Sequence, residues 1–277
     1  MVRTVLASLL IVLGAGACTA APSDPARVDD PALEQTGTRA TLVQVVDGDS
    51  IAVEINGRVE EVRMIGINAP EGDECFGNRA RNALAAYLEG NDLVLVEGSV
   101  DAVDRFGRLL RYIYVGGENA NTRMLADGNA VTLQSDHRDN EAFVNLGNVA
   151  AEAGRGMWAA DACGPPPPPG MSIAHIQYNP PGPDDEFLND EFVVLANNGG
   201  DIELAGWALR DESSQNRYVF GTLTLRTGDS VAVRTGCGTD RPGTVHWCSE
   251  RSVWSNTGDT VMLQDQHGNV ADRRTYQ

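Results

Sequence analysis

Six polar residues between positions 47 and 108 carry groups that a reaction on a phosphodiester requires. They are two acids around a glycine, an arginine inside an apolar strand, an amide and an acid after that strand, and an arginine after a turn: Asp47, Asp49, Arg63, Asn68, Glu71 and Arg108. Carboxylate and amide oxygens bind hard cations, guanidinium groups bind phosphate, and a carboxylate can deprotonate water. Together they predict a metal-assisted attack on a phosphodiester.

Each of these positions also has a purely structural interpretation. Acids in a DGD segment commonly occupy a solvated turn, and RFGR is an ordinary hairpin sequence. Arg63 could pair with Glu60 or Glu61 at the edge of a sheet. The combination of residues favours the catalytic interpretation more than any one of them does.

The segments that carry these residues predict a small barrel over residues 39–164. Alternating apolar residues and the turn signals DGD and NG predict antiparallel strands at 40–47, 49–55 and 58–67. A helical apolar spacing in CFGNRARNALAAYLEG comes next, and DLVLVEG and RLLRYIYV predict two further strands. Helical patterns at 119–128 and 139–153 complete five strands and three helices, which suits an α+β barrel of the OB type.

Residues 40–163 resemble the staphylococcal nuclease-like (thermonuclease) family in four motifs that follow the family's order: VVDGDSIAV, VRMIGINAPE, DRFGRLLRYIYV and AGRGMW. The resemblance implies an endonuclease that cleaves DNA or RNA to products with a 3′-phosphate. It implies that Arg63 and Arg108 bind the phosphate, with Arg108 near the departing 5′ oxygen. Glu71 would then orient or deprotonate the attacking water.

The resemblance also implies a Ca²⁺ cofactor. Asp49 matches the family's calcium-binding aspartate, Asp47 matches the neighbouring acid, and Ala69 matches a main-chain carbonyl ligand. Asn68 stands where the family has a second aspartate, so the site keeps an oxygen ligand but loses one negative charge. Because Ca²⁺ affinity depends on the number of carboxylate ligands, we expect a weaker site that is occupied at millimolar Ca²⁺.

A second departure concerns the nucleobases. The family's base-stacking tyrosines would fall near Gln134 and Asp136, where the sequence has no aromatic residue. The contacts to bases are therefore expected to differ from the family's, whereas the residues for the phosphate chemistry are present.

The second half of the chain predicts an all-β domain over residues 171–277. Short apolar strands separated by turn signals predict an immunoglobulin-like β-sandwich. The segments GWALRD and WSNTGDTVML resemble the lamin-tail domain of bacterial exported proteins, which implies a module for attachment or recognition whose ligand is unknown. The proline run at 165–170 predicts an extended spacer between the two domains.

The N-terminus predicts export. Residues 1–18 combine Arg3, a short apolar stretch and small residues before Cys18, which is the pattern of a signal peptide. The ending AGAC resembles a bacterial lipobox, which implies lipidation of Cys18 and a membrane anchor, although Ala15 replaces the usual leucine and cleavage without a lipid is the alternative. Residues 19–38 predict a flexible tether, and the mature protein is expected in the cell envelope or outside the cell.

The remaining cysteines predict disulfides in an exported chain. Cys75, Cys163, Cys237 and Cys248 allow three connectivities. The domain boundary favours Cys75–Cys163 and Cys237–Cys248, one bond in each domain. The first bond would pin the loop after Glu71 to the end of the barrel domain.

The charge of the chain limits how it can bind nucleic acid. The net charge is −18 and all 21 basic residues are arginine, so phosphate binding must rest on a few local guanidiniums. The favoured function is an exported, membrane-anchored, monomeric, Ca²⁺-dependent nuclease. The alternative is a catalytically inactive scaffold that binds nucleic acid or the envelope.

Overall fold

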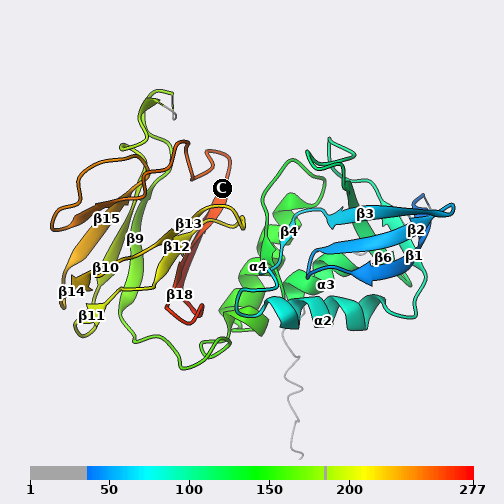
Figure 1. The fold of residues 1–277 in the computed structure, drawn as a ribbon, viewed down its shortest axis with the longest axis horizontal. Helices are drawn as coiled ribbons and strands as arrows, with labels where there is room; N and C mark the ends of the chain where they lie inside the picture. The colour runs from blue at the N-terminus through cyan, green and yellow to red at the C-terminus, as the bar shows by residue number, and fades with distance from the viewer. Residues whose placement is uncertain (1–35, 184–185) are drawn as a thin grey trace, which may run out of the picture.

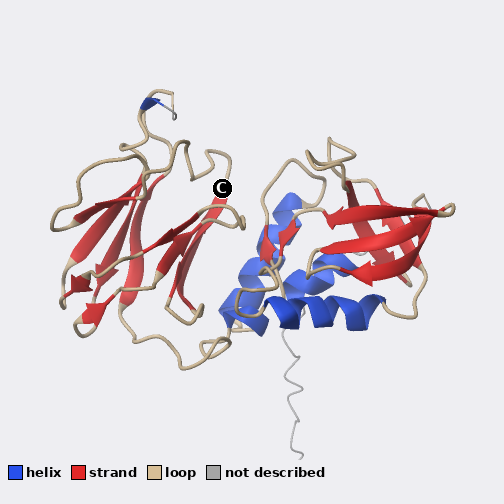
Figure 2. Ribbon diagram, viewed as in Figure 1, coloured by secondary structure: helices blue, strands red, loops and turns tan. Residues whose placement is uncertain are grey.

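The chain forms two domains that lie side by side in the computed structural model, which describes residues 36–183 and 186–277 (Figure 1). The predicted signal peptide, Cys18 and nearly all of the predicted tether lie outside the described residues. None of the helices within the described ranges is long and apolar enough to cross a bilayer. Figure 2 shows the long helices gathered under one domain, whereas the other domain is built from strands.

The first domain is a closed five-stranded barrel, as predicted. Its strands are β1 (Thr38–Val45), β2 (Ser50–Ile55), β3 (Arg58–Met64), β5 (Leu93–Val96) and β6 (Leu109–Val115). They follow the order β3-β2-β1-β5-β6, and a parallel pairing of β3 with β6 closes the barrel. The short strand β7 (Glu118–Asn119) extends the sheet beyond β6.

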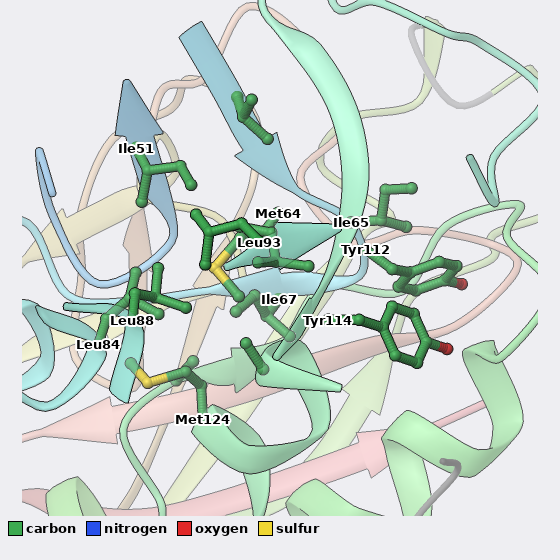
Figure 3. Close-up of a cluster of buried hydrophobic side chains, with 14 of the residues drawn as sticks. Ile51, Met64, Ile65, Ile67, Leu84, Leu88, Leu93, Tyr112, Tyr114 and Met124 are labelled. Carbon is green, nitrogen blue, oxygen red and sulfur yellow. The ribbon is translucent and has the colours of Figure 1, made fainter. Parts of the chain in front are cut away.

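Three helices cover one end of the barrel and complete its core. They are α2 (Gly77–Leu88), α3 (Ala120–Ala126) and α4 (Asn140–Glu152), followed by the short 3₁₀ helix η1 (Gly156–Trp158). Helix α2 buries one residue per turn, at Ala80, Leu84 and Leu88. Figure 3 shows Leu84 and Leu88 beside strand residues such as Leu93 in this core.

The predicted strand over 58–67 is shorter than expected. Strand β3 ends at Met64 because Gly66 adopts a left-handed conformation (φ +72°) and turns the chain out of the barrel sheet. A side chain at Gly66 would also collide with the ring of His137. The next residues form a separate strand, β4 (Ile67–Asn68), which pairs with β8 (Val131–Thr132).

The second domain is a sandwich of two four-stranded sheets. One sheet has the order β16-β15-β10-β9 and comprises Thr244–His246, Ser230–Arg234, Phe192–Asn197 and Met171–Gln177. The other has the order β13-β12-β17-β18 and comprises Arg217–Val219, Ala208–Arg210, Asp259–Gln264 and Val270–Tyr276. A two-stranded sheet joins β11 (Ile202–Glu203) to β14 (Thr224–Leu225), and Trp207 and Trp254 are buried in the core.

The two domains are packed together by apolar and polar contacts. An apolar cluster crosses the interface and includes Val131, Met157 and Met262. The start of the predicted proline spacer is bonded to the sandwich, because Asn269 accepts a hydrogen bond from the Cys163 N–H (2.7 Å) and donates one to the Pro165 carbonyl (2.9 Å). The linker therefore holds the sandwich against the barrel.

Candidate active site

The strand register brings the candidate residues to one mouth of the barrel. Ser50, at the start of β2, lies opposite Arg63 near the end of β3, and Arg63 lies opposite Leu110 at the start of β6. Asp49 and Arg108 immediately precede β2 and β6. All six polar side chains singled out in the sequence line one cavity of about 690 Å³: Asp47, Asp49, Arg63, Asn68, Glu71 and Arg108.

Asp49 is a buried carboxylate at the base of this cavity. Its Oδ2 accepts a hydrogen bond from the Ala69 N–H (2.7 Å), and its Oδ1 accepts one from the Ser50 hydroxyl (2.8 Å). Burial raises the pKa of Asp49 to about 6, and the Asp47 charge raises it too, although the Arg63 guanidinium opposes both effects. The site therefore holds a carboxylate whose negative charge is only partly compensated.

Arg63 is held rigidly between the two oxygen-bearing residues Asp49 and Asn68. Its Nε contacts Asp49 Oδ1 at 3.1 Å, and one Nη2 N–H donates to Asn68 Oδ1 (3.1 Å). Its Nη1 donates to the carbonyls of Met64 and Ile67, at 2.8 and 2.7 Å. Because a guanidinium has five N–H donors, these four contacts leave one for a ligand in the cavity.

Arg108 is positioned by the turn that precedes β6. Asp104 accepts a hydrogen bond from Arg108 Nε (2.7 Å) and bonds from the backbone N–H groups of Phe106 and Arg108 (2.9 Å each). Burial alone would raise the pKa of Asp104, but these hydrogen bonds outweigh it and hold the pKa below its ordinary value. Arg108 Nη1 also reaches the Ser50 hydroxyl at 3.4 Å, so the guanidinium is aimed at the mouth of the barrel.

Glu71 lies in the loop between β4 and α2, and its side chain is exposed. No other described residue bonds its carboxylate, so that group is available to solvent in the cavity. The loop itself is fixed, because the Glu71 N–H donates to Glu74 Oε2 (3.1 Å) and Cys75 is bonded to Cys163. Gly77 allows the loop to close, since a Cβ at that position would lie 1.8 Å from the Glu71 carbonyl oxygen.

The residues at the cavity suit a hard cation in their chemistry. Asp49 and Asp47 supply carboxylate oxygens and Asn68 an amide oxygen to the cavity lining, whereas Ala69, whose main-chain carbonyl is the remaining implied ligand, does not line the cavity. Asp47 is partly engaged, because its Oδ1 accepts the Asp49 N–H at 2.9 Å. Within the described ranges no three His, Cys, Asp or Glu residues form a metal-binding group, so a cation here would need the amide oxygen of Asn68 beside the carboxylates of Asp49 and Asp47.

Both predicted disulfides are present. Cys75 is bonded to Cys163, and Cys237 is bonded to Cys248. The first bond closes 88 residues and joins the Glu71 loop to the end of the barrel domain. The second lies within the sandwich and closes 11 residues.

Sequence reasoning missed several residues of the cavity. Ser50 and Asp104 bond the catalytic candidates, and the DRF turn, which resembles other Asp-initiated turns, was an available signal for Asp104. Phe106 is 69% exposed and lines the cavity, where an aromatic ring is suited to stacking on a base. Of the two residues near which the family's base-stacking tyrosines would fall, Gln134 contacts the sandwich, where its backbone N–H donates to Glu212, and Asp136 is exposed and does not line the cavity.

Comparisons with known proteins match both halves of the chain. The model described as Staphylococcal nuclease homologue matches residues 61–160, and the model described as Lamin Tail Domain matches residues 165–277. The chain is 36% identical over 101 residues to a Shigella flexneri protein named micrococcal nuclease, covering 33% of this chain and 56% of that protein. It is 32% identical over 126 residues to the thermonuclease of Staphylococcus hyicus, covering 43% of this chain and 74% of that protein.

A third relative extends the match. The chain is 30% identical over 127 residues to an uncharacterized endonuclease of Escherichia coli O157:H7, covering 46% of this chain and 80% of that protein. The nuclease family model ends at residue 160, before the first strand of the sandwich at Met171. The chain therefore belongs to the staphylococcal nuclease family and carries a lamin tail domain after the barrel.

Proposed function

We propose that the protein is a nuclease that hydrolyses phosphodiester bonds of DNA or RNA in the cavity at the mouth of the barrel. The observation that carries this proposal is the meeting of two guanidiniums, a buried carboxylate and an unbonded carboxylate on one cavity: Arg63, Arg108, Asp49 and Glu71. The relatives that are named nucleases and endonucleases support the same reaction.

Each residue has a distinct task in this reaction. Glu71, exposed and unbonded, orients a water molecule and takes its proton as the water attacks phosphorus. Arg108 and the remaining N–H of Arg63 donate hydrogen bonds to phosphate oxygens whose negative charge grows in the transition state. The family resemblance implies departure of the 5′ oxygen, which leaves a 3′-phosphate on the product.

We include Ca²⁺ as the cofactor of this reaction. Asp49, Asn68 and the main-chain carbonyl of Ala69 would hold it, with Asp47 beside them. The ion would supply positive charge next to a non-bridging phosphate oxygen. The partly compensated charge of Asp49 supports cation binding, and the amide of Asn68 makes the site a weak one.

The proposal is tested by degradation of a DNA substrate with and without a calcium chelator. We expect cleavage in millimolar Ca²⁺, its loss with the chelator, and its loss in Asp49→Ala. The control is Glu54→Ala, which removes an exposed carboxylate of the same barrel. Tight DNA binding by the wild-type protein without cleavage would replace the nuclease with a binding scaffold.

We also propose export and anchoring through Cys18, in a part of the sequence outside the described residues. The observation is the signal-like sequence that ends in AGAC. Mass spectrometry of the mature protein should find a lipid on Cys18, and Cys18→Ser should release the protein from membranes. An unmodified mature N-terminus beyond residue 18 would show simple secretion instead.

A further inference from the structure

The hairpin that joins β12 to β13 in the lamin tail domain projects toward the barrel domain (Figure 1). Residues 210–217, which we call the bridging hairpin, contact three separate barrel loops. Arg210 pairs with Glu74 in the Glu71 loop (3.0 Å), and Gln215 accepts a hydrogen bond from Arg105 in the turn before β6 (3.1 Å). A third contact joins Glu212 to the backbone N–H of Gln134, as described above. The hairpin is therefore fixed around the cavity.

The bridging hairpin also forms part of the cavity wall. Ser213, Ser214 and Gln215 line the same cavity of about 690 Å³ as the catalytic candidates. The hydroxyl of Ser213 is turned back to Asp211 (2.8 Å), whereas Ser214 and Gln215 are exposed. One wall of the catalytic cavity thus belongs to the second domain.

A second cavity continues from the first along the domain interface. It has a volume of about 460 Å³ and is lined by both domains, with Asp73 on the barrel side and Arg210 and Arg217 on the hairpin side. Glu71 and Ser214 line both cavities, so the two spaces meet at the carboxylate that is proposed to activate water. Together they make one groove that runs from the catalytic candidates to Arg217.

Arg217 is the available cation in the second cavity. Its side chain is exposed, and no acceptor among the described residues bonds it. Arg210, in contrast, is buried and engaged by Glu74 and by the carbonyl of Ser213 (2.9 Å). Three acids oppose Arg217 on the barrel side, Glu71, Asp73 and Glu74, of which Glu74 is paired with Arg210. A bound phosphate must therefore lie nearer to Arg217 than to Glu71 and Asp73.

We propose that the lamin tail domain supplies one wall of the substrate groove, and that Arg217 binds a backbone phosphate of the nucleic acid beyond the scissile bond. The inference rests on the proposed nuclease function and makes the second domain part of substrate binding. The substrate class follows from the groove: a polynucleotide strand gains the contact with Arg217, and a single-nucleotide diester in the catalytic cavity does not.

The test compares two substrates of the full chain: a short single-stranded oligonucleotide and a nitrophenyl phosphodiester of a single nucleotide. The variants are Arg217→Ala and Arg217→Glu. The matched control is Arg226→Glu, which makes the same charge change after β14, at the far side of the sandwich in Figure 1. Values of kcat and KM are measured over a range of salt concentrations.

We expect Arg217→Glu to lower kcat/KM for the oligonucleotide by about fivefold or more relative to Arg226→Glu, through KM. The loss should be several times smaller for the single-nucleotide diester. Arg217→Ala should reduce the slope of log(kcat/KM) against log salt by about 0.7, the value for one phosphate contact on a single strand.

The outcomes separate this inference from the proposed function. If the wild-type protein cleaves neither substrate, the nuclease proposal fails. If it cleaves both and the Arg217 variants match Arg226→Glu on the oligonucleotide, the nuclease stands and the shared groove is wrong. Equal losses on both substrates would also overturn it, because they would show a general disturbance of the catalytic cavity.

Discussion

Arg63 and Asn68 show how single residues set the properties of the cavity. Asn68 is buried and its amide oxygen accepts a hydrogen bond from Arg63, so the amide links the guanidinium to the proposed calcium ligands. An aspartate here would add a second buried negative charge next to Asp49, whose own charge is already disfavoured by burial. The amide of Asn68 therefore lowers the affinity for a cation, and it also avoids the electrostatic repulsion between two buried carboxylates.

Asn68→Asp is expected to lower the Ca²⁺ concentration that gives half-maximal activity by about tenfold, because each added carboxylate ligand strengthens a calcium site. Asn68→Ala, which removes the ligand oxygen, is the control and should raise that concentration. The measurement is a calcium titration of nuclease activity. An unchanged half-saturation in Asn68→Asp would show that residue 68 does not contact the ion.

Arg108→Ala is expected to lower kcat by about 10²–10³-fold, the usual cost of removing one preorganised donor to a growing negative charge. Asp104→Asn keeps the size of the side chain and weakens its hydrogen bonds to Arg108 and to the Phe106 N–H but leaves the guanidinium in place, so the loss of kcat should be smaller. Steady-state kinetics on an oligonucleotide checks both. If Asp104→Asn lowers kcat more than Arg108→Ala does, the turn that contains Asp104, and not the Arg108 guanidinium, makes the larger contribution to kcat.

At the scale of elements, the loop between β4 and α2 is the part that places the general base. A disulfide, a glycine and an ion pair hold it, through Cys75, Gly77 and Glu74. Gly77 acts within the local sequence, whereas Cys75 and Glu74 act through partners that lie 88 and 136 residues away. The position of Glu71 thus depends on segments far along the chain, one of them in the second domain.

Replacing Cys75 and Cys163 together by serine should lower both thermal stability and kcat. Loss of a natural disulfide costs about 2–5 kcal/mol, and here it also releases the loop that carries Glu71. The matched control replaces Cys237 and Cys248 by serine, which opens a bond in the sandwich. Calorimetry and steady-state kinetics are the readouts. If the variant that lacks Cys75 and Cys163 is destabilised but fully active, the disulfide does not position Glu71.

Local patterns explain what could be predicted from the sequence. The barrel strands and three helices follow apolar alternation and spacing, and the catalytic candidates lie in contiguous motifs. The third strand was expected to end at residue 67 and ends at Met64, because apolar residues continue past that point whereas the backbone conformation of Gly66 turns the chain away. The bridging hairpin was missed because its contacts depend on how two domains pack, which no local pattern in residues 210–217 records.

At the scale of the whole molecule, the domain interface contains a group of buried acids. Glu212, Asp211 and Asp259 are all buried, and Gln134 of the barrel donates hydrogen bonds to Glu212. Burial, with the neighbouring Asp259 charge, raises the pKa of Glu212 to about 9. Burial and the Asp211 charge likewise raise the pKa of Asp259 to about 7.

These acids make the stability of the chain depend on pH. The folded protein keeps a proton on Glu212 that the unfolded chain releases above its ordinary pKa of 4.5, so stability falls as the pH rises from there to about 9. Glu212→Gln should raise Tm at pH 8–9 by about 3–6 °C, which corresponds to about 1–2 kcal/mol, and flatten this dependence. Glu89→Gln, an exposed acid, is the control, and identical Tm profiles of the two variants would contradict the prediction.

Hydrolysis by a water molecule that Glu71 activates is the central claim, and Glu71→Gln tests it most directly. The substitution keeps the size and polarity of an exposed side chain, so the folded barrel and the binding of substrate should be preserved. Single-turnover cleavage at saturating oligonucleotide and Ca²⁺ should slow by about 10²-fold or more, with little change in the oligonucleotide Kd. A Glu71→Gln variant that cleaves at the wild-type rate would contradict the assignment of the base and, with it, the mechanism of the cavity.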